Sequence, residues 1–135
     1  MPSPLPLFQI TDHQIDRVVR VFYARIRAHG ELGPVFAAHV RDWPAHETRI
    51  AAFWRNAILK ERCYDGNPMR VHVARPEIRP DHFPLWLSLF HEVLTQELAA
   101  DTAARWGALA DRIGHGLKMG LTSMRQKPDD VPSLL

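Results

Sequence analysis

The sequence has little of several features that identify common classes of protein. Its 135 residues include one cysteine, Cys63, which cannot form an internal disulfide, so nothing in the chain requires an oxidising compartment. No stretch approaches the ~18 apolar residues of a membrane span, and the first ten residues lack the basic and apolar runs of a signal peptide. We therefore expect a cytoplasmic protein with no membrane partner.

Charge clusters and nucleotide-binding motifs are missing as well. The net charge is +2 and the basic residues are scattered, so the sequence predicts no nucleic-acid partner. There is no Gly-rich phosphate loop, C-x-x-C pair or G-x-S-x-G motif. The hydrophobic share of 46% is ordinary for one globular domain. We read 1–135 as a single domain whose Pro- and polar-rich ends, 1–7 and 126–135, are loose.

What the chain does contain is helical periodicity, which predicts an all-α fold. The expected helices are four long ones over 11–29, 44–60, 80–98 and 101–124, and a short one over 68–75. Thr11 and Gln14 form a capping box at the first start, and Pro44 and Pro68 suit the first turns of two others. Pro76 ends the short helix, because the residue before a proline is pushed out of helical geometry.

Ring side chains interrupt this pattern at five places: Tyr23, Phe36, His46, His72 and Trp86. Three of them fall on the apolar stripes of long helices, one in a tight turn expected at 33–36 and one in the last turn of the short helix. A histidine placed to hold a group, facing tyrosine, histidine and tryptophan, indicates a buried cofactor pocket rather than a plain core.

His72 is the candidate metal ligand. A neutral imidazole can donate one ring nitrogen to a metal such as haem iron, while a carbonyl group of its own short helix holds the other nitrogen. The alternative is a solvated histidine on a linker. The helix signals on both sides of His72 and the polar aromatic residues opposite it favour the ligand.

The residues expected opposite His72 have two interpretations each. His46 shares a helix face with Ile50 and Phe53 and should point inward. It is either a satisfied core or rim residue, or a group that bonds a ligand, gates access or ligates iron. Tyr23 and Trp86 either pack between helices or direct their donors at a bound O2, whose partial negative charge they would stabilise in preference to CO.

Taken together, these residues resemble the truncated haemoglobins of group III. The matching pieces are Phe22-Tyr23, Leu32-Gly33-Pro34 with Phe36, His46 with Ile50, Phe53-Trp54, Tyr64-x-Gly66-x-Pro68 with His72, and Trp86-Leu87-x-Leu89-Phe90. The resemblance covers residues 8–125, and the order and spacing of the pieces carry it. The chain also has no Gly-Gly pair, as in group III and unlike groups I and II.

The resemblance implies a shortened globin fold, a two-over-two helical sandwich around a b-type haem (iron protoporphyrin IX). It implies His72 as proximal iron ligand and a distal side lined by Tyr23, His46, Ile50 and Trp86. The further cofactor contacts that we expect are Phe36, Phe53, Phe83, Phe90, Arg70 and Arg75. The two arginines flank His72 and are our guesses for the propionate partners.

Three functions remain open. The first, which we favour, is reversible binding of O2 and other small ligands such as CO, NO and cyanide, with distal donors that slow O2 release. The second is NO dioxygenase or peroxidase-like chemistry, which would need a separate reductase because no flavin or nicotinamide domain fits in 135 residues. The third is a helical interaction module without cofactor. We expect a monomer or weak dimer.

Overall fold

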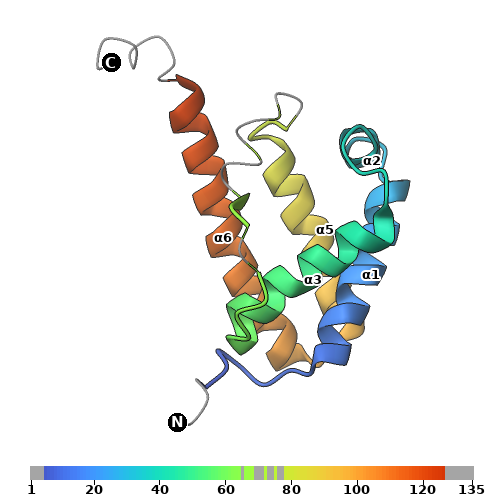
Figure 1. Cartoon of the computed structure of the whole chain (residues 1–135), viewed down its shortest axis with the longest axis vertical. Helices are drawn as coiled ribbons and strands as arrows, with labels where there is room; N and C mark the ends of the chain where they lie inside the picture. Colours follow the sequence, from blue (N-terminus) through green and yellow to red (C-terminus); the bar gives the residue numbers. More distant parts are fainter. Residues whose placement is uncertain (1–4, 65, 69–71, 73–74, 76–77, 127–135) are drawn as a thin grey trace.

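Five helices make up the described part of the chain, residues 5–64, 66–68, 72, 75 and 78–126 of the computed structural model (Figure 1). Their bounds are α1 Asp12–Ala28, α2 Leu32–Ala37, α3 Trp43–Leu59, α5 His82–Glu97 and α6 Ala100–Gln126. No strand occurs among these described residues. The prediction of an all-α fold is therefore confirmed, and the four long helices lie within about two residues of their expected bounds.

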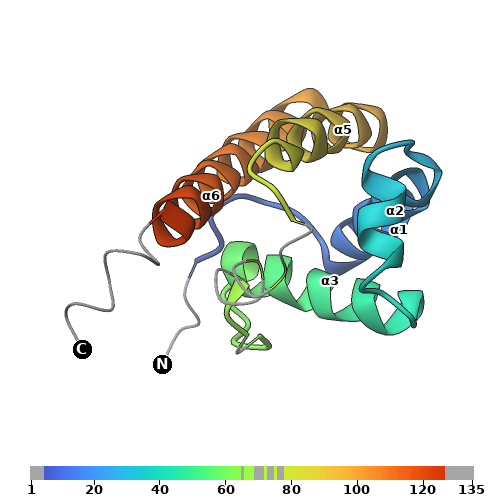
Figure 2. The ribbon, with the colours of Figure 1, turned by 90° about the horizontal axis from the view of Figure 1, so that it is seen from above.

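The helices form two layers. Seen from above, α5 and α6 lie side by side in one layer and α3 lies in the opposite layer (Figure 2). α5 packs along α6, while α1 packs against α3, α2 and α5. This is the two-over-two arrangement expected from the sequence, and it leaves α3 facing α5 and α6 across the molecule.

An aromatic core joins the two layers. Phe90 is 1% exposed and stacks on Trp54 of α3 at a centroid distance of 5.5 Å and on Trp86 at 4.9 Å. Trp106 of α6 is fully buried with its ring edge against Trp54, at 5.5 Å. Aromatic rings in these geometries add specific attraction to the burial of their large apolar area. Trp54 and Trp106 are therefore core residues.

Capping residues explain where α1 and α3 begin. The capping box of α1 is present: the Gln14 backbone N–H donates to Thr11 Oγ1 at 3.1 Å, and the Thr11 N–H donates to Gln14 Oε1 at 2.9 Å. Asp42 caps α3 by accepting from the Ala45 N–H at 3.1 Å. These bonds satisfy backbone donors that have no partner within the helix.

The prediction of a tight turn at 33–36 is wrong, because these residues belong to α2. The His29 ring caps this short helix: its Nδ1 accepts from the backbone N–H groups of Glu31 and Leu32, each at 3.1 Å. Pro34 lies in the first turn, where its missing N–H leaves no helical bond unmade. Phe36, expected to be buried, is half-buried.

Parts of the sequence predictions fall outside the described residues. In the expected short helix, Pro68 and His72 are helical, while Arg70 and Pro76 lie outside the described residues. The end of the chain beyond α6 lies outside them too.

Near the other end, the Leu7 N–H donates to the Ile58 carbonyl group at 2.9 Å, which ties this segment to α3. Within the described residues no helix has the length and apolarity to cross a membrane.

Candidate functional site

A cavity of about 260 Å3 lies between the two layers, with walls from α3 on one side and α5 and α6 on the other. Its lining is mostly apolar. The structure brings nearly all of the predicted site residues to this one cavity: Tyr23, Phe36, His46, Ile50, Phe53, His72, Arg75, Phe83 and Trp86. They come from α1, α2, α3, α5 and the connection before α5, so the fold assembles them from distant parts of the chain.

Of the two remaining predicted contacts, one is not on the cavity surface and the other cannot be located. Phe90 lies in the core behind Trp86, with 1% of its surface exposed, and Arg70 lies outside the described residues. Arg49 and Tyr64 are among the lining residues that were not predicted from the sequence. A signal for Arg49 existed, because it follows His46 by three residues and therefore shares its helix face.

The His72 ring has the tautomer that a metal ligand needs. Its Nδ1 lies 2.5 Å from the Pro68 carbonyl oxygen. A carbonyl oxygen can only accept, so Nδ1 carries a proton, and in the neutral ring the lone pair is then on Nε2. The ring also lies 5.6 Å from that of Phe83. A neutral imidazole oriented by its own helix in this way is the usual form of a metal-binding histidine.

His46 is a neutral histidine held by aromatic packing. Burial, together with the positive charges of Arg49 and Arg75, lowers its pKa from 6.5 to about 4. Its Nε2 is buried and makes no hydrogen bond to any described residue. The ring instead meets the Tyr23 ring edge to face, with centroids 5.0 Å apart. A buried ring nitrogen without a partner is costly unless a bound group supplies one.

Tyr23 and Trp86 both line the cavity, and the Trp86 side chain affects the Tyr23 hydroxyl group. Burial raises the pKa of Tyr23 well above its usual range, a hydrogen bond with the Trp86 side chain opposes the rise, and the Glu47 charge adds to it. An indole N–H can only donate, so the Tyr23 oxygen accepts. Tyr23 is only 3% exposed and stays protonated, which leaves its own O–H as a donor on the cavity side.

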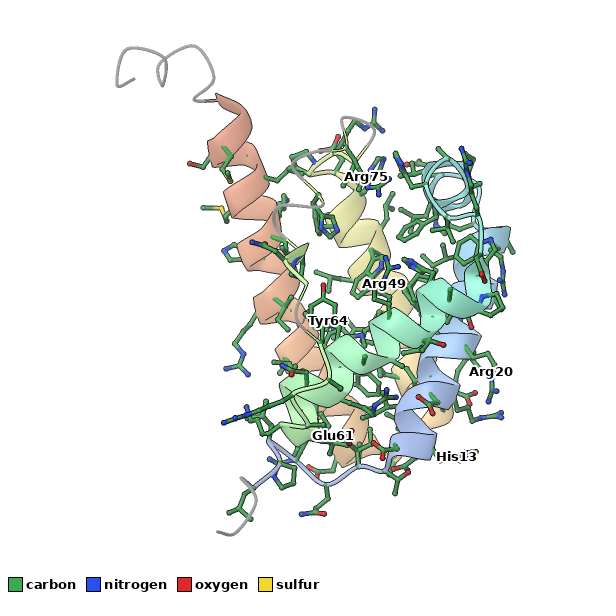
Figure 3. The ribbon with its side chains drawn as sticks, viewed as in Figure 1. His13, Arg20, Arg49, Glu61, Tyr64 and Arg75 are labelled. Atoms are coloured by element: carbon green, nitrogen blue, oxygen red, sulfur yellow. The ribbon has the colours of Figure 1, made fainter. Side chains whose placement is uncertain are left out.

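The cavity also has positively charged residues in its lining. Arg49 of α3 and Arg75, from the connection before α5, both belong to it (Figure 3). Arg75 Nη1 lies 2.5 Å from His39 Nδ1, and since guanidinium only donates, His39 accepts as a neutral ring. Arg49 makes no ion pair with a carboxylate of the described residues. The site therefore combines an apolar interior, two inward histidines and an arginine pair that suits carboxylates.

Comparison with known proteins identifies the class of this fold. No protein-family model matches the chain. The crystal structure of a group III truncated haemoglobin from Campylobacter jejuni aligns with a TM-score of 0.79 and 26% identity, over 87% of this chain and 95% of that one. The fold is thus that of a truncated globin.

The sequence comparison places the chain more narrowly. A Campylobacter jejuni protein named group 3 truncated hemoglobin ctb is 32% identical over 89 residues, which is 63% of this chain and 70% of that protein. The chain belongs to the group III truncated haemoglobins. The resemblance drawn from its residues is confirmed.

Proposed function

We propose that this protein binds b-type haem with His72 as the proximal iron ligand, and binds O2 and other small diatomic ligands on the opposite side. Membership of a haemoglobin family implies a haem cofactor. The observation that carries the proposal is one apolar cavity lined both by His72, with Nδ1 held by Pro68, and by His46, whose Nε2 has no partner among the described residues.

The side chains of the cavity fit such a cofactor. The apolar lining from α3, α5 and α6 suits the porphyrin ring, and the arginines at positions 49 and 75 suit its two propionates. His72 has the tautomer required of an iron ligand. A haem in the cavity would also place a neighbour, or a bound ligand, beside the unpartnered Nε2 of His46.

When bound, the haem supplies an iron coordination position at which a diatomic ligand can bind. Tyr23 directs its O–H at a ligand that carries partial negative charge, such as O2. Trp86 donates to the Tyr23 oxygen and so orients the hydroxyl and strengthens it as a donor. His46 stands beside Tyr23, neutral and able to donate a second hydrogen bond. These donors slow the release of O2 more than that of CO, which carries less charge.

A second candidate, NO dioxygenase or peroxidase-like activity, draws support from His46. His46 is neutral at physiological pH, and its Nε2, which has no hydrogen-bond partner among the described residues, can bond an oxygen species in the cavity. That activity would depend on a separate reductase. We favour ligand binding, in a cytoplasmic protein that is a monomer or weak dimer.

The test is reconstitution with haemin of the wild type, His72→Ala and His115→Ala, the last being a control at an exposed histidine of α6. Visible spectra in ferric, ferrous and CO-bound states should show one haem per chain in the wild type and control. His72→Ala should lose haem or show altered ligation. A wild type without stoichiometric haem, or a His72→Ala spectrum identical to the wild type, would overturn the proposal.

A further inference from the structure

Three residues that the proposed function does not use adjoin the Tyr23 and His46 rings through Trp43: Arg27, Trp43 and Glu47, which we call the α1–α3 clasp. Arg27 lies in the last turn of α1, and its Cζ is 4.8 Å from the centroid of the Trp43 ring. Its Nη1 is 3.5 Å from Glu47 Oε2. Trp43 and Glu47 are four residues apart in α3, so they share a helix face. The clasp therefore joins α1 to the beginning of α3.

The clasp touches the site through the Trp43 ring. That ring lies 5.8 Å from the His46 ring at an interplanar angle of 82°, and 6.1 Å from the Tyr23 ring. Tyr23 is buried, whereas Trp43 is half-buried, so Trp43 stands at the boundary between the site and solvent. His46 Nε2 has no hydrogen bond within the described part of the chain. The ring contacts are thus what orients this histidine.

We propose that Trp43 is a positioning residue of the distal side: held by Arg27 and Glu47, it keeps the His46 ring turned into the cavity. This proposal rests on the proposed function, because that function supplies the ligand that His46 faces. For the His46 ring to swing outward, Trp43 must move, and its cation–π contact with Arg27 must break. Arg27 is 40% exposed, so salt weakens the contacts that hold the clasp. Outward movement of His46 should therefore become more frequent as ionic strength rises.

The first test measures how often His46 reaches solvent. Diethyl pyrocarbonate modifies neutral imidazole rings, and mass spectrometry gives the modification rate of His46 relative to the exposed His115. We expect Arg27→Gln to raise that rate about fivefold, and 0.5 M NaCl to raise it in the wild type but not in Arg27→Gln. Arg25→Gln is the matched control, since Arg25 lies on the same helix but pairs with Glu92 of α5 at 2.8 Å. Equal rates in the two variants would overturn the clasp.

The second test uses the CO-bound ferrous protein. The CO stretching frequency depends on the polar groups beside the ligand, so a mobile His46 should give a second band. We expect that band, and faster CO association, in Arg27→Gln and in Trp43→Ala, and a single band in Arg25→Gln. One unchanged band in all variants would overturn the clasp and leave haem binding intact. A wild type that binds no haem would instead overturn the proposed function, and the modification rates would still test the clasp.

Discussion

At the scale of single residues, the proposed function gives Tyr23 and Trp86 different roles: Tyr23 donates to the ligand, and Trp86 supports Tyr23. From the sequence, both either pack between helices or donate directly to the ligand. We propose that the Trp86 N–H donates to the Tyr23 oxygen, whose pKa the Trp86 side chain lowers, so that Tyr23 is the residue whose proton remains for a ligand. No sequence pattern contains this order, because it depends on how two helices set the rotamers of residues 63 positions apart.

The order leads to a graded prediction for O2 release. Tyr23→Phe removes the direct donor to a partly charged ligand and should raise the O2 dissociation rate by about 10- to 100-fold. Trp86→Phe removes only the supporting bond and should raise it about fivefold. Stopped-flow displacement of O2 by CO measures both rates, with CO dissociation as the internal control that should change little. A larger effect from Trp86→Phe than from Tyr23→Phe would contradict this order.

His46 should make stability depend on pH. Its pKa is about 4 in the folded protein and near 6.5 when the chain unfolds. Between these values the unfolded chain binds more protons, so stability is lost as pH falls through 6.5 towards 4. Urea unfolding at pH 7.0 and 5.0 should show that the wild type loses about 1 to 2 kcal/mol more than His46→Gln, which cannot titrate. Parallel pH profiles would exclude this role.

The cavity residues on long helices were predictable because helical spacing assigns a face. Tyr23, His46 and Ile50 fall on inward stripes and reach the cavity. Helical spacing does not show which residues of an inward face reach the cavity and which lie in the core. Phe90 and Trp86 are one turn apart on the same stripe, yet the crossing of α3 over α5 leaves Trp86 at the cavity and Phe90 in the core.

At the scale of elements, α2 is the helix that the sequence did not predict. Its six residues are too few to show a period, and only two of them, Leu32 and Gly33, are buried. His29, which caps it, is not among the usual capping residues. Its ring nitrogen accepts the backbone hydrogen bonds that a side-chain oxygen accepts in the common caps. Long helices were predictable for the opposite reasons, since their stripes repeat and their caps are common ones.

The junction between α1 and α2 depends on a glycine. A Cβ atom at Gly33 would lie 3.0 Å from the Arg27 carbonyl oxygen and 3.3 Å from that of Ile26. Both are backbone atoms of the last turn of α1 and cannot turn aside as a side chain could. Gly33 therefore allows α2 to lie directly against the end of α1, the turn that contains Arg27 of the clasp.

Gly33→Ala should destabilise the protein by about 1 to 3 kcal/mol, because the added methyl group pushes the two helices apart. Gly116→Ala is the matched control: a Cβ there meets nothing within 4 Å, and alanine favours the helix. That change should stabilise the protein by about 0.5 to 1 kcal/mol. Thermal unfolding followed by circular dichroism measures both. A Gly33→Ala protein as stable as the control would show that the close approach is not needed.

At the scale of the whole molecule, the cavity is bordered by both layers, so a bound cofactor should stabilise the fold. A ligand that binds only the folded state adds about 2.7 kcal/mol when present at 100 times its Kd. We expect haemin at that excess to raise the free energy of unfolding of the wild type by this amount, and by clearly less in His72→Ala. Denaturant titrations with and without haemin measure the difference. Equal gains in the two proteins would mean that His72 does not hold the cofactor.

The stacking of Phe90 between Trp54 and Trp86 affects the entropy of binding at the cavity. Both tryptophans line the cavity, and each is fixed by a ring packed behind it. Their rotamer freedom is therefore already lost when the chain folds, together with that of the core. A flat ligand that enters between α3 and α5 meets walls that need no further ordering, so the entropic cost of binding falls mainly on the ligand itself.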